Sequence, residues 1–198
     1  MTVWRYVIVN DDGSAPNYER PVTLAICKPA IRRNAREGDI ILAFKGRRLC
    51  ARGERWNHNE LVWGGVISAK LRFSDYWNDK RFQKKKPHRS KAPDNLYKPT
   101  QFGFEQIPNR VHQGETQKRR DLRGQFVLAL KPAWHFKGGS ELPPQYRALN
   151  MPLSARRGHR RVEMNSKEAR RLKAWLAARP RMRNSHIQSN TSSCEPSC

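Results

Sequence analysis

The apolar residues of this chain gather in short runs that are rich in β-branched and aromatic side chains. Such runs, separated by polar and glycine-containing segments, are typical of buried β-strands. The runs that predict strands are residues 3–9, 40–44, 61–69 and 126–130. A shorter run at residues 22–27 fits either a strand or the entry to a helix. The pair Gly64-Gly65 indicates a bulge or a close backbone approach inside its strand.

Helices are predicted to be short. Pro29 suits the first position of a basic helix over residues 29–35 that Gly38 would end, and Ser74 suits the cap of a helical turn over 74–78. Asn165 and Glu168 predict a capping box at the start of a helix over about 166–179, which Pro180 would end. One face of that helix would carry Ala169, Leu172, Trp175 and Leu176.

The pattern favours an α+β fold: a small curved mixed β-sheet or barrel with short peripheral helices and a C-terminal helix. We expect loops at residues 45–60 and 80–91, irregular chain at 99–116, and a final helical turn at 142–149. Composition divides the chain into a domain at residues 1–150 and a basic extension at 151–198, with a disordered end from residue 187.

Positive charge greatly exceeds negative charge. The chain has 40 Lys and Arg against 17 Asp and Glu, a net charge of +23. Self-repulsion opposes folding, so this excess predicts a polyanionic partner, with nucleic acid or a nucleotide as the first candidate. The alternative is a solubilising surface or a basic tail that binds nothing specific.

Other features narrow the class of protein. We find no leader-like segment and no apolar stretch that could span a membrane, and none of the four cysteines forms a C-x-x-C pair. These features predict a cytoplasmic protein with no membrane partner and no structural metal site. The six histidines are scattered without a zinc-deaminase motif, and no phosphate-loop motif occurs. No cofactor can be assigned from the sequence.

Three segments together resemble a known family. They are Asp-Gly-Ser-Ala-Pro-Asn at 12–17 with Thr-Leu-Ala-Ile-Cys-Lys-Pro-Ala-Ile-Arg-Arg at 23–33 and Gly-Asp at 38–39, then Asp-Tyr-Trp-Asn-Asp-Lys-Arg-Phe-Gln-Lys-Lys-Lys-Pro at 75–87, then Asp-Asn-Leu-Tyr at 94–97 with Phe-Val-Leu at 126–128. This ordered set resembles the nucleotide modification associated domain family, in its second class, over roughly residues 3–145. The resemblance implies a link to nucleic-acid modification in phages and bacteria, and it implies no particular reaction.

A second resemblance concerns the fold alone. A short helix that leads into Gly38-Asp39 and a strand, followed by a strand with a Gly-Gly pair, is similar to domains of the PUA, ASCH and EVE type. That resemblance implies a small barrel-like fold of a kind that often binds RNA or modified bases.

Basic residues near the expected helix at 29–35 form the first candidate site. Lys28 and Arg32 are four residues apart and share a helix face, and with Arg33 they can hold a phosphate. The alternative is a solvated basic face. Cys27 lies just before them and can act as a nucleophile in positive surroundings, although a small buried side chain at a strand end is the preferred interpretation.

Aromatic and polar residues form the second candidate site. Trp77 followed by Arg81 suits base stacking with phosphate neutralisation, or else simply anchors a loop on the core. Asp94 and Asn95 can bind a base edge or a sugar hydroxyl, or else form a turn after Pro93. Asn17 and Tyr97, from the segments that carry the family resemblance, complete the candidate binding residues.

These observations favour a binding module that holds a nucleobase, modified or flipped, in a basic and aromatic-lined pocket. The first alternative is an enzyme of nucleotide or base modification in which Cys27 or Asp94 takes part in the chemistry. The second alternative is a basic scaffold that binds RNA or DNA without a pocket.

Overall fold

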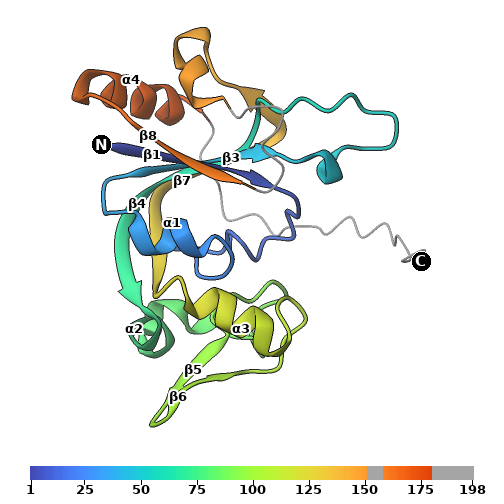
Figure 1. The fold of residues 1–198 in the computed structure, drawn as a ribbon, viewed down its shortest axis with the longest axis vertical. Helices are drawn as coiled ribbons and strands as arrows, with labels where there is room; N and C mark the ends of the chain where they lie inside the picture. Colours follow the sequence, from blue (N-terminus) through green and yellow to red (C-terminus); the bar gives the residue numbers. More distant parts are fainter. Residues whose placement is uncertain (151–157, 180–198) are drawn as a thin grey trace.

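A single mixed sheet organises the protein. The structure, a computed structural model, describes residues 1–150 and 158–179, and within them six strands lie in the order β2-β7-β4-β3-β1-β8 (Figure 1). These strands are β1 (Thr2–Ile8), β2 (Val22–Leu24), β3 (Ile40–Lys45), β4 (Glu60–Arg72), β7 (Phe126–Glu141) and β8 (His159–Glu163). β1 and β3 are parallel, and the other neighbours are antiparallel.

The expected α+β class with a mixed sheet is confirmed. β2 and β8 form the two edges of the sheet, so the sheet is open and the barrel form does not occur. All four predicted strands are present, and β4 and β7 extend well beyond the apolar runs that predicted them. The extra length is partly exposed, and for that reason the apolar pattern did not mark it.

The glycine pair in β4 is required by close packing. A Cβ atom on Gly64 would lie 3.0 Å from Leu42 Cδ2, and a Cβ atom on Gly65 would lie 2.8 Å from Leu130 Cδ2. The register between β4 and β7 also shifts directly after Gly65. Both the close approach and the irregularity predicted from the sequence are therefore present.

Short helices cover the sheet. They are α1 (Pro29–Asn34), η1 (Arg47–Leu49), α2 (Phe73–Asn78), η2 (Lys80–Lys85), α3 (Gly114–Leu122), η3 (Pro144–Leu149) and α4 (Ser166–Ala177). Figure 1 places α4 on one side of the sheet, and α1, α2 and α3 on the other. Pro29 begins α1 as expected, and the final turn predicted at residues 142–149 is η3.

Each face of the sheet has its own apolar core. On the side of α4, Leu172 and Leu176 pack with Val3, Leu42 and Trp134 of the sheet. On the opposite side, one core contains Trp4, Tyr6, Trp63 and Ile31 of α1. A third core joins α2, η2 and β7 through Phe73, Tyr76, Phe82, Tyr97 and Val127.

Residues beyond 150 contribute to the sheet and to its core. β8 pairs with β1, and Asn165 and Glu168 form the predicted capping box at the start of α4. Ala169, Leu172 and Leu176 are buried, and Trp175 packs against them at the margin. Pro180 and the end of the chain from residue 187 lie outside the described residues. The division of the chain at residue 150 stays a prediction.

Three local predictions are wrong. Ser74 does not cap α2, because the helix already begins at Phe73, which is buried in the third core. The basic segment 80–91 is not simply a loop, since its first half is η2 with Phe82 and Lys85 buried. The region expected to be irregular at 99–116 contains most of a two-stranded hairpin, β5 (Tyr97–Thr100) and β6 (Gly103–Gln106), and the start of α3. These elements are too short and too exposed to produce an apolar period.

Candidate functional site

Cys27 lies in a strained turn between β2 and α1. Cys27 has φ 59° and Lys28 has φ 41°, both in the left-handed region that residues other than glycine rarely adopt. Such a conformation costs about 1–3 kcal/mol and persists only where neighbouring groups hold it. The backbone N–H of Cys27 donates a 2.8 Å hydrogen bond to Asp121 Oδ1, which ties this turn to α3.

A histidine from a distant loop faces the Cys27 sulfur. His112 Nε2 lies 3.4 Å from Cys27 Sγ, and His112 Nδ1 lies 2.5 Å from Asp121 Oδ2. The same Asp121 oxygen accepts a 2.7 Å hydrogen bond from the Tyr97 hydroxyl. The order thiol, imidazole, buried carboxylate is the arrangement in which a histidine exchanges a proton with a nucleophile while a carboxylate orients its ring.

The charge on His112 follows from these neighbours. Burial alone would lower the pKa of the imidazole, but its hydrogen bonds to Asp121 and Cys27 outweigh burial and raise the pKa to about 10. His112 is therefore protonated at neutral pH, with the Asp121 carboxylate on one side and the sulfur on the other. The imidazole stands 3.4 Å from the sulfur, within reach for a proton exchange between the two side chains.

Arg32 holds the two halves of this site together. Its buried guanidinium donates to three carbonyl oxygens, those of Cys27 at 2.7 Å, Phe126 at 2.8 Å and Asp121 at 2.5 Å. Burial lowers the pKa of Arg32 to about 10, and the charge of Asp121 acts against this shift. A Cβ atom on Gly124 would collide with the same guanidinium, so a glycine is required there.

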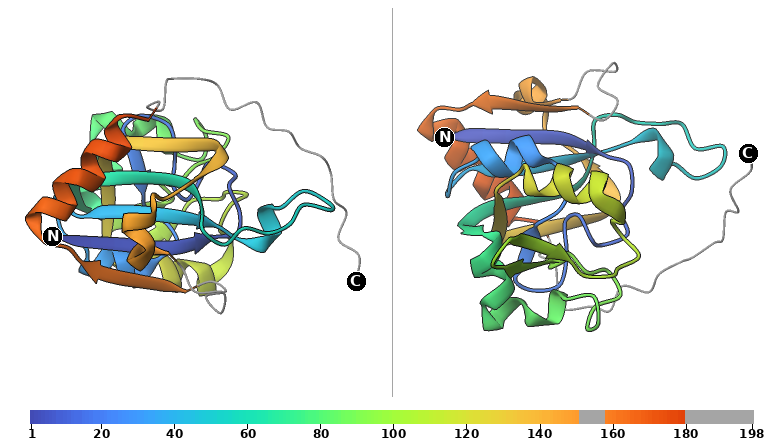
Figure 2. Two further views of the ribbon diagram at one scale, coloured as in Figure 1. Left: turned by 90° about the horizontal axis from the view of Figure 1, so that it is seen from above. Right: turned by 60° about the horizontal axis from the view of Figure 1, so that its bottom comes forward.

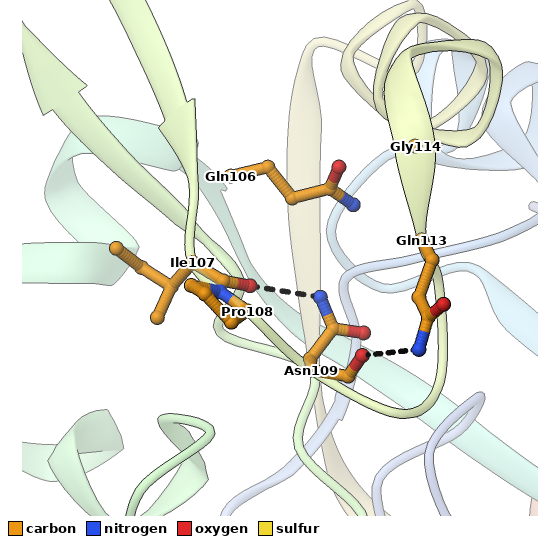
Figure 3. Close-up of a pocket in the computed structure, with 6 residues that line it drawn as sticks. All are labelled: Gln106, Ile107, Pro108, Asn109, Gln113 and Gly114. Carbon is orange, nitrogen blue, oxygen red and sulfur yellow. Dashed lines mark hydrogen bonds between the residues drawn. The ribbon is translucent and has the colours of Figure 1, made fainter.

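Amide side chains fix the loop that carries His112. Asn109 Oδ1 accepts hydrogen bonds from the backbone N–H groups of Val111 at 3.0 Å and His112 at 2.7 Å, while Gln106 Nε2 donates to the His112 carbonyl at 2.8 Å. This loop forms a hollow of about 300 Å³, and Figure 3 shows the residues that line it. Its lining residues flank His112 in the chain on both sides: Gln106, Ile107, Pro108, Asn109, Gln113 and Gly114.

A second polar network surrounds Asp94. Its two carboxylate oxygens accept hydrogen bonds of 2.6 Å from the hydroxyl groups of Thr23 and Tyr76. Asp94 is fully buried, and burial raises its pKa to about 6 against the lowering effect of Lys85 and of the two hydroxyls. Both oxygens are thus engaged inside the protein.

Asn17 and Asn95 belong to the same region. Lys85, itself buried, donates to Asn17 Oδ1 at 2.6 Å and to the Glu19 carbonyl at 2.7 Å, and burial lowers its pKa to about 8. The Asn95 amide donates to the Tyr76 carbonyl at 3.1 Å. These contacts connect the segments 17–19, 76 and 85–95 to one another.

The remaining candidate residues lie apart from this network. Lys28 Nζ donates to the Val7 carbonyl at 3.1 Å, and Arg33 is exposed on α1. Trp77 is half-buried with Lys86 Nζ 3.8 Å from its ring centroid, and Arg81 is exposed and paired with Asp79 at 2.6 Å.

The ten candidate residues thus separate into distinct groups. Cys27, Arg32 and Tyr97 meet at Asp121, Arg32 through its backbone carbonyl and the other two through its carboxylate, whereas Asn17 and Asp94 lie in the second network. None of the ten lines the hollow beside His112. Nor does any of them line a second hollow, of about 370 Å³, formed by residues 20–22 and 130–133.

Sequence reasoning missed His112 and Asp121. They lie 85 and 94 residues beyond Cys27, and neither stands in a motif with it. Their partnership depends on α3 packing beside α1, and a single sequence carries no local signal for that contact. A polar, irregular segment that contains a histidine just before a helix is the one hint that the sequence offers.

Two further findings concern metals and membranes. In residues 1–150 and 158–179, no group of three or more His, Cys, Asp or Glu side chains is placed to hold a metal ion. No helix in the same residues has the length and apolar character that a membrane crossing needs.

Comparison with known proteins gives one match. The family model described as nucleotide modification associated domain 2 matches residues 1–192, so the match continues well past residue 145, where the resemblance in the sequence was placed. No curated protein and no solved structure matches the chain.

Proposed function

The chain belongs to the nucleotide modification associated domain 2 family, and on that premise we propose that it is an enzyme that modifies nucleotides, free or within nucleic acid, through the Cys27 thiol. The observation that carries this proposal is the contact series Cys27 Sγ to His112 Nε2 at 3.4 Å and His112 Nδ1 to Asp121 Oδ2 at 2.5 Å. The strained turn at Cys27 supports it, since strain of this kind is concentrated at functional sites.

The chemistry assigned to these residues is covalent catalysis. The Cys27 thiolate attacks an electrophilic carbon of the substrate, a C–S bond forms, and the bond from that carbon to the leaving group breaks. Protonated His112 gives its proton to the leaving group. Water then attacks the same carbon while His112 takes a proton from the water. The C–S bond breaks, and the Cys27 thiolate is restored. Asp121 keeps the imidazole oriented throughout.

Asp94, the other catalytic candidate, receives a structural role in this proposal. Its carboxylate has no exposed surface, and both of its oxygens accept hydrogen bonds from Thr23 and Tyr76. Cys27, in contrast, is partly exposed.

The test is mass spectrometry of nucleosides and of the intact protein. The full chain is incubated with a mixture of nucleoside triphosphates, with genomic DNA and with total RNA, and nucleic acid from expressing cells is analysed in parallel. We expect a changed nucleoside or a protein adduct that disappears in Cys27→Ser and persists in Cys50→Ser, the control at the second free cysteine of the described chain. Activity that survives Cys27→Ser would overturn the proposal.

A second candidate function is recognition of a modified base without chemistry. It is favoured by the half-buried Trp77, whose ring centroid lies 3.8 Å from Lys86 Nζ, because an aromatic ring paired with a cation suits base stacking with phosphate neutralisation. Fluorescence titration with modified and plain oligonucleotides tests this candidate, with Trp77→Ala as the variant. A base preference that depends on Trp77 supports recognition. Binding without any base preference, which weakens uniformly as each cation is removed, indicates a non-specific basic scaffold.

A further inference from the structure

The β5–β6 hairpin presents an apolar side chain to solvent. Phe102, at its tip, is 92% exposed, and it is the one large apolar residue with high exposure in the described part of the chain. Figure 1 shows this hairpin projecting from the end of the molecule opposite α4. Because a single exposed apolar residue is ordinary on a protein surface, the position of Phe102 gains its meaning from the charged groups near it.

The base of the hairpin is held firmly. The Phe104 ring packs against Phe73 with centroids 5.9 Å apart, and the Tyr97 hydroxyl donates to Asp121 of α3 at 2.7 Å. The Ile107 N–H donates to the Leu96 carbonyl at 2.9 Å where the hairpin closes. The tip is therefore presented by a fixed support that also contacts the Asp121 carboxylate of the candidate active site.

Exposed arginines lie on α1 and at the end of α3, the helix that contacts the base of the hairpin through Asp121. Arg33 lies on α1 and Arg36 lies just beyond its end, while Arg120 is in the last turn of α3 and Arg123 directly follows it; we call these four exposed residues the arginine surface. The two helices are joined by the hydrogen bond from Arg32 to the Asp121 carbonyl, and the hairpin lies beside α3, where the Tyr97 hydroxyl donates to the Asp121 carboxylate (Figure 1).

Carboxylates do not neutralise this surface. None of its four arginines forms an ion pair within the described residues. Glu115 of α3 already pairs with Lys118 at 3.5 Å and Arg119 at 3.3 Å. Glu37, the carboxylate next to Arg36 in the chain, accepts from the backbone N–H of Lys70 at 3.2 Å.

We propose that the Phe102 tip and the arginine surface bind a nucleic-acid strand, with Phe102 inserted among the bases and the arginines on the backbone phosphates. This inference rests on the proposed function and names its substrate class as a polymer rather than a free nucleotide. A single phenylalanine between Gln101 and Gly103 offers too little apolar area for a protein partner or a second copy of the chain. Apolar wedges next to cations are the means by which proteins separate stacked bases.

The test measures binding in the Cys27→Ser background, so that it does not depend on chemistry. Fluorescence anisotropy with labelled single-stranded and duplex oligonucleotides should show that Phe102→Ala weakens binding about fivefold or more, whereas Phe102→Trp retains it. The added indole should lose fluorescence on binding, relative to the parent protein, as it stacks on a base. Phe102 is so exposed that neither change is expected to affect folding.

The arginine surface has a matched control. Arg120→Glu with Arg123→Glu should weaken binding and reduce the slope of log affinity against log salt by about 1.4–1.8, the value for two lost phosphate contacts. Arg47→Glu with Arg48→Glu changes the charge equally on η1, in a separate loop (Figure 2), and should leave the slope nearly unchanged.

Several results would overturn the inference. The first is an unchanged oligonucleotide affinity in Phe102→Ala, and the second is an equal loss of affinity in the two double arginine variants. The others are no binding to any oligonucleotide, or Phe102-dependent dimerisation or vesicle binding instead of oligonucleotide binding. If the proposed function failed instead, wild-type and Cys27→Ser proteins would give the same nucleosides. The dependence of oligonucleotide affinity on Phe102 and on the arginine surface would then remain. Full activity on free nucleotides, unaffected by competing oligonucleotide, would contradict the inference and leave the role of Cys27 intact.

Discussion

The buried guanidinium of Arg32 links the segment that carries Cys27 to the segment that carries Asp121. It bonds the carbonyl of Cys27 and the carbonyl of Asp121, so the nucleophile and the carboxylate that orients its histidine share one anchor. Sequence reasoning assigned Arg32 to phosphate binding. Its zero exposure and its three carbonyl partners fit a support for the site better than a ligand-binding residue.

We expect Arg32→Lys to destabilise the protein by about 2–5 kcal/mol, because an ammonium group cannot reach all three carbonyls and buried acceptors would lose their donors. Urea unfolding followed by circular dichroism measures the change. Arg33→Lys is the control, since Arg33 is the exposed neighbour on the same helix and should stay within about 0.5 kcal/mol of wild type. Equal effects of the two changes would refute the anchoring role.

The charge on His112 predicts a pH dependence of stability. Its pKa of about 10 in the folded protein exceeds the ordinary value of 6.5, so folding favours the protonated form. The stabilisation is complete below pH 6.5 and is lost as the pH rises through about 10. Lys85, with its pKa lowered to about 8, acts in the opposite direction above pH 8.

Comparison with His112→Gln isolates the contribution of the histidine, because Lys85 is common to both proteins. The free energy of unfolding of wild type minus that of the variant, measured by urea titration, should be largest near pH 6 and should shrink toward pH 10. A difference that stays constant over this range would mean that His112 is not held as a cation by Asp121.

At the level of elements, strands were predicted where a whole run is buried, as at residues 40–44, which have no exposed surface. The β5–β6 hairpin escaped prediction because its strands have four residues each and are half-exposed. η2 was not predicted for a related reason. Its buried residues are Phe82 and Lys85, and one apolar side chain in a basic segment produces no apolar pattern. The open sheet follows from β2 and β8 at its two edges, and apolar patterns carry no information about closure.

The packing of α4 against the sheet can be tested by mutation. Leu172 is fully buried against the sheet, and Leu172→Ala should cost about 2–5 kcal/mol through lost contacts and the cavity left behind. Thermal and urea unfolding measure the loss, with Arg171→Ala as the exposed neighbouring control. A cost below about 0.5 kcal/mol would show that α4 is not part of the cooperative fold.

At the level of the whole molecule, sequence reasoning reached the family but not the site. Net charge and the ordered motifs predicted a link to nucleic acid, and the family match agrees with the link to nucleotide modification. Cys27 was a candidate nucleophile without a partner. His112 and Asp121 became its partners only through the packing of α3 and the 106–113 loop against the turn after β2, which no local pattern encodes.

The account depends most on Cys27 being an activated thiol. The direct measurement is the rate of alkylation of Cys27 by iodoacetamide, followed by peptide mass spectrometry between pH 5 and pH 8, in wild type and in His112→Gln. We predict that Cys27 reacts faster than Cys50 at the acidic end and that His112→Gln slows Cys27 there by on the order of tenfold or more. Cys27 reacting no faster than Cys50, or equally fast without His112, would contradict the account.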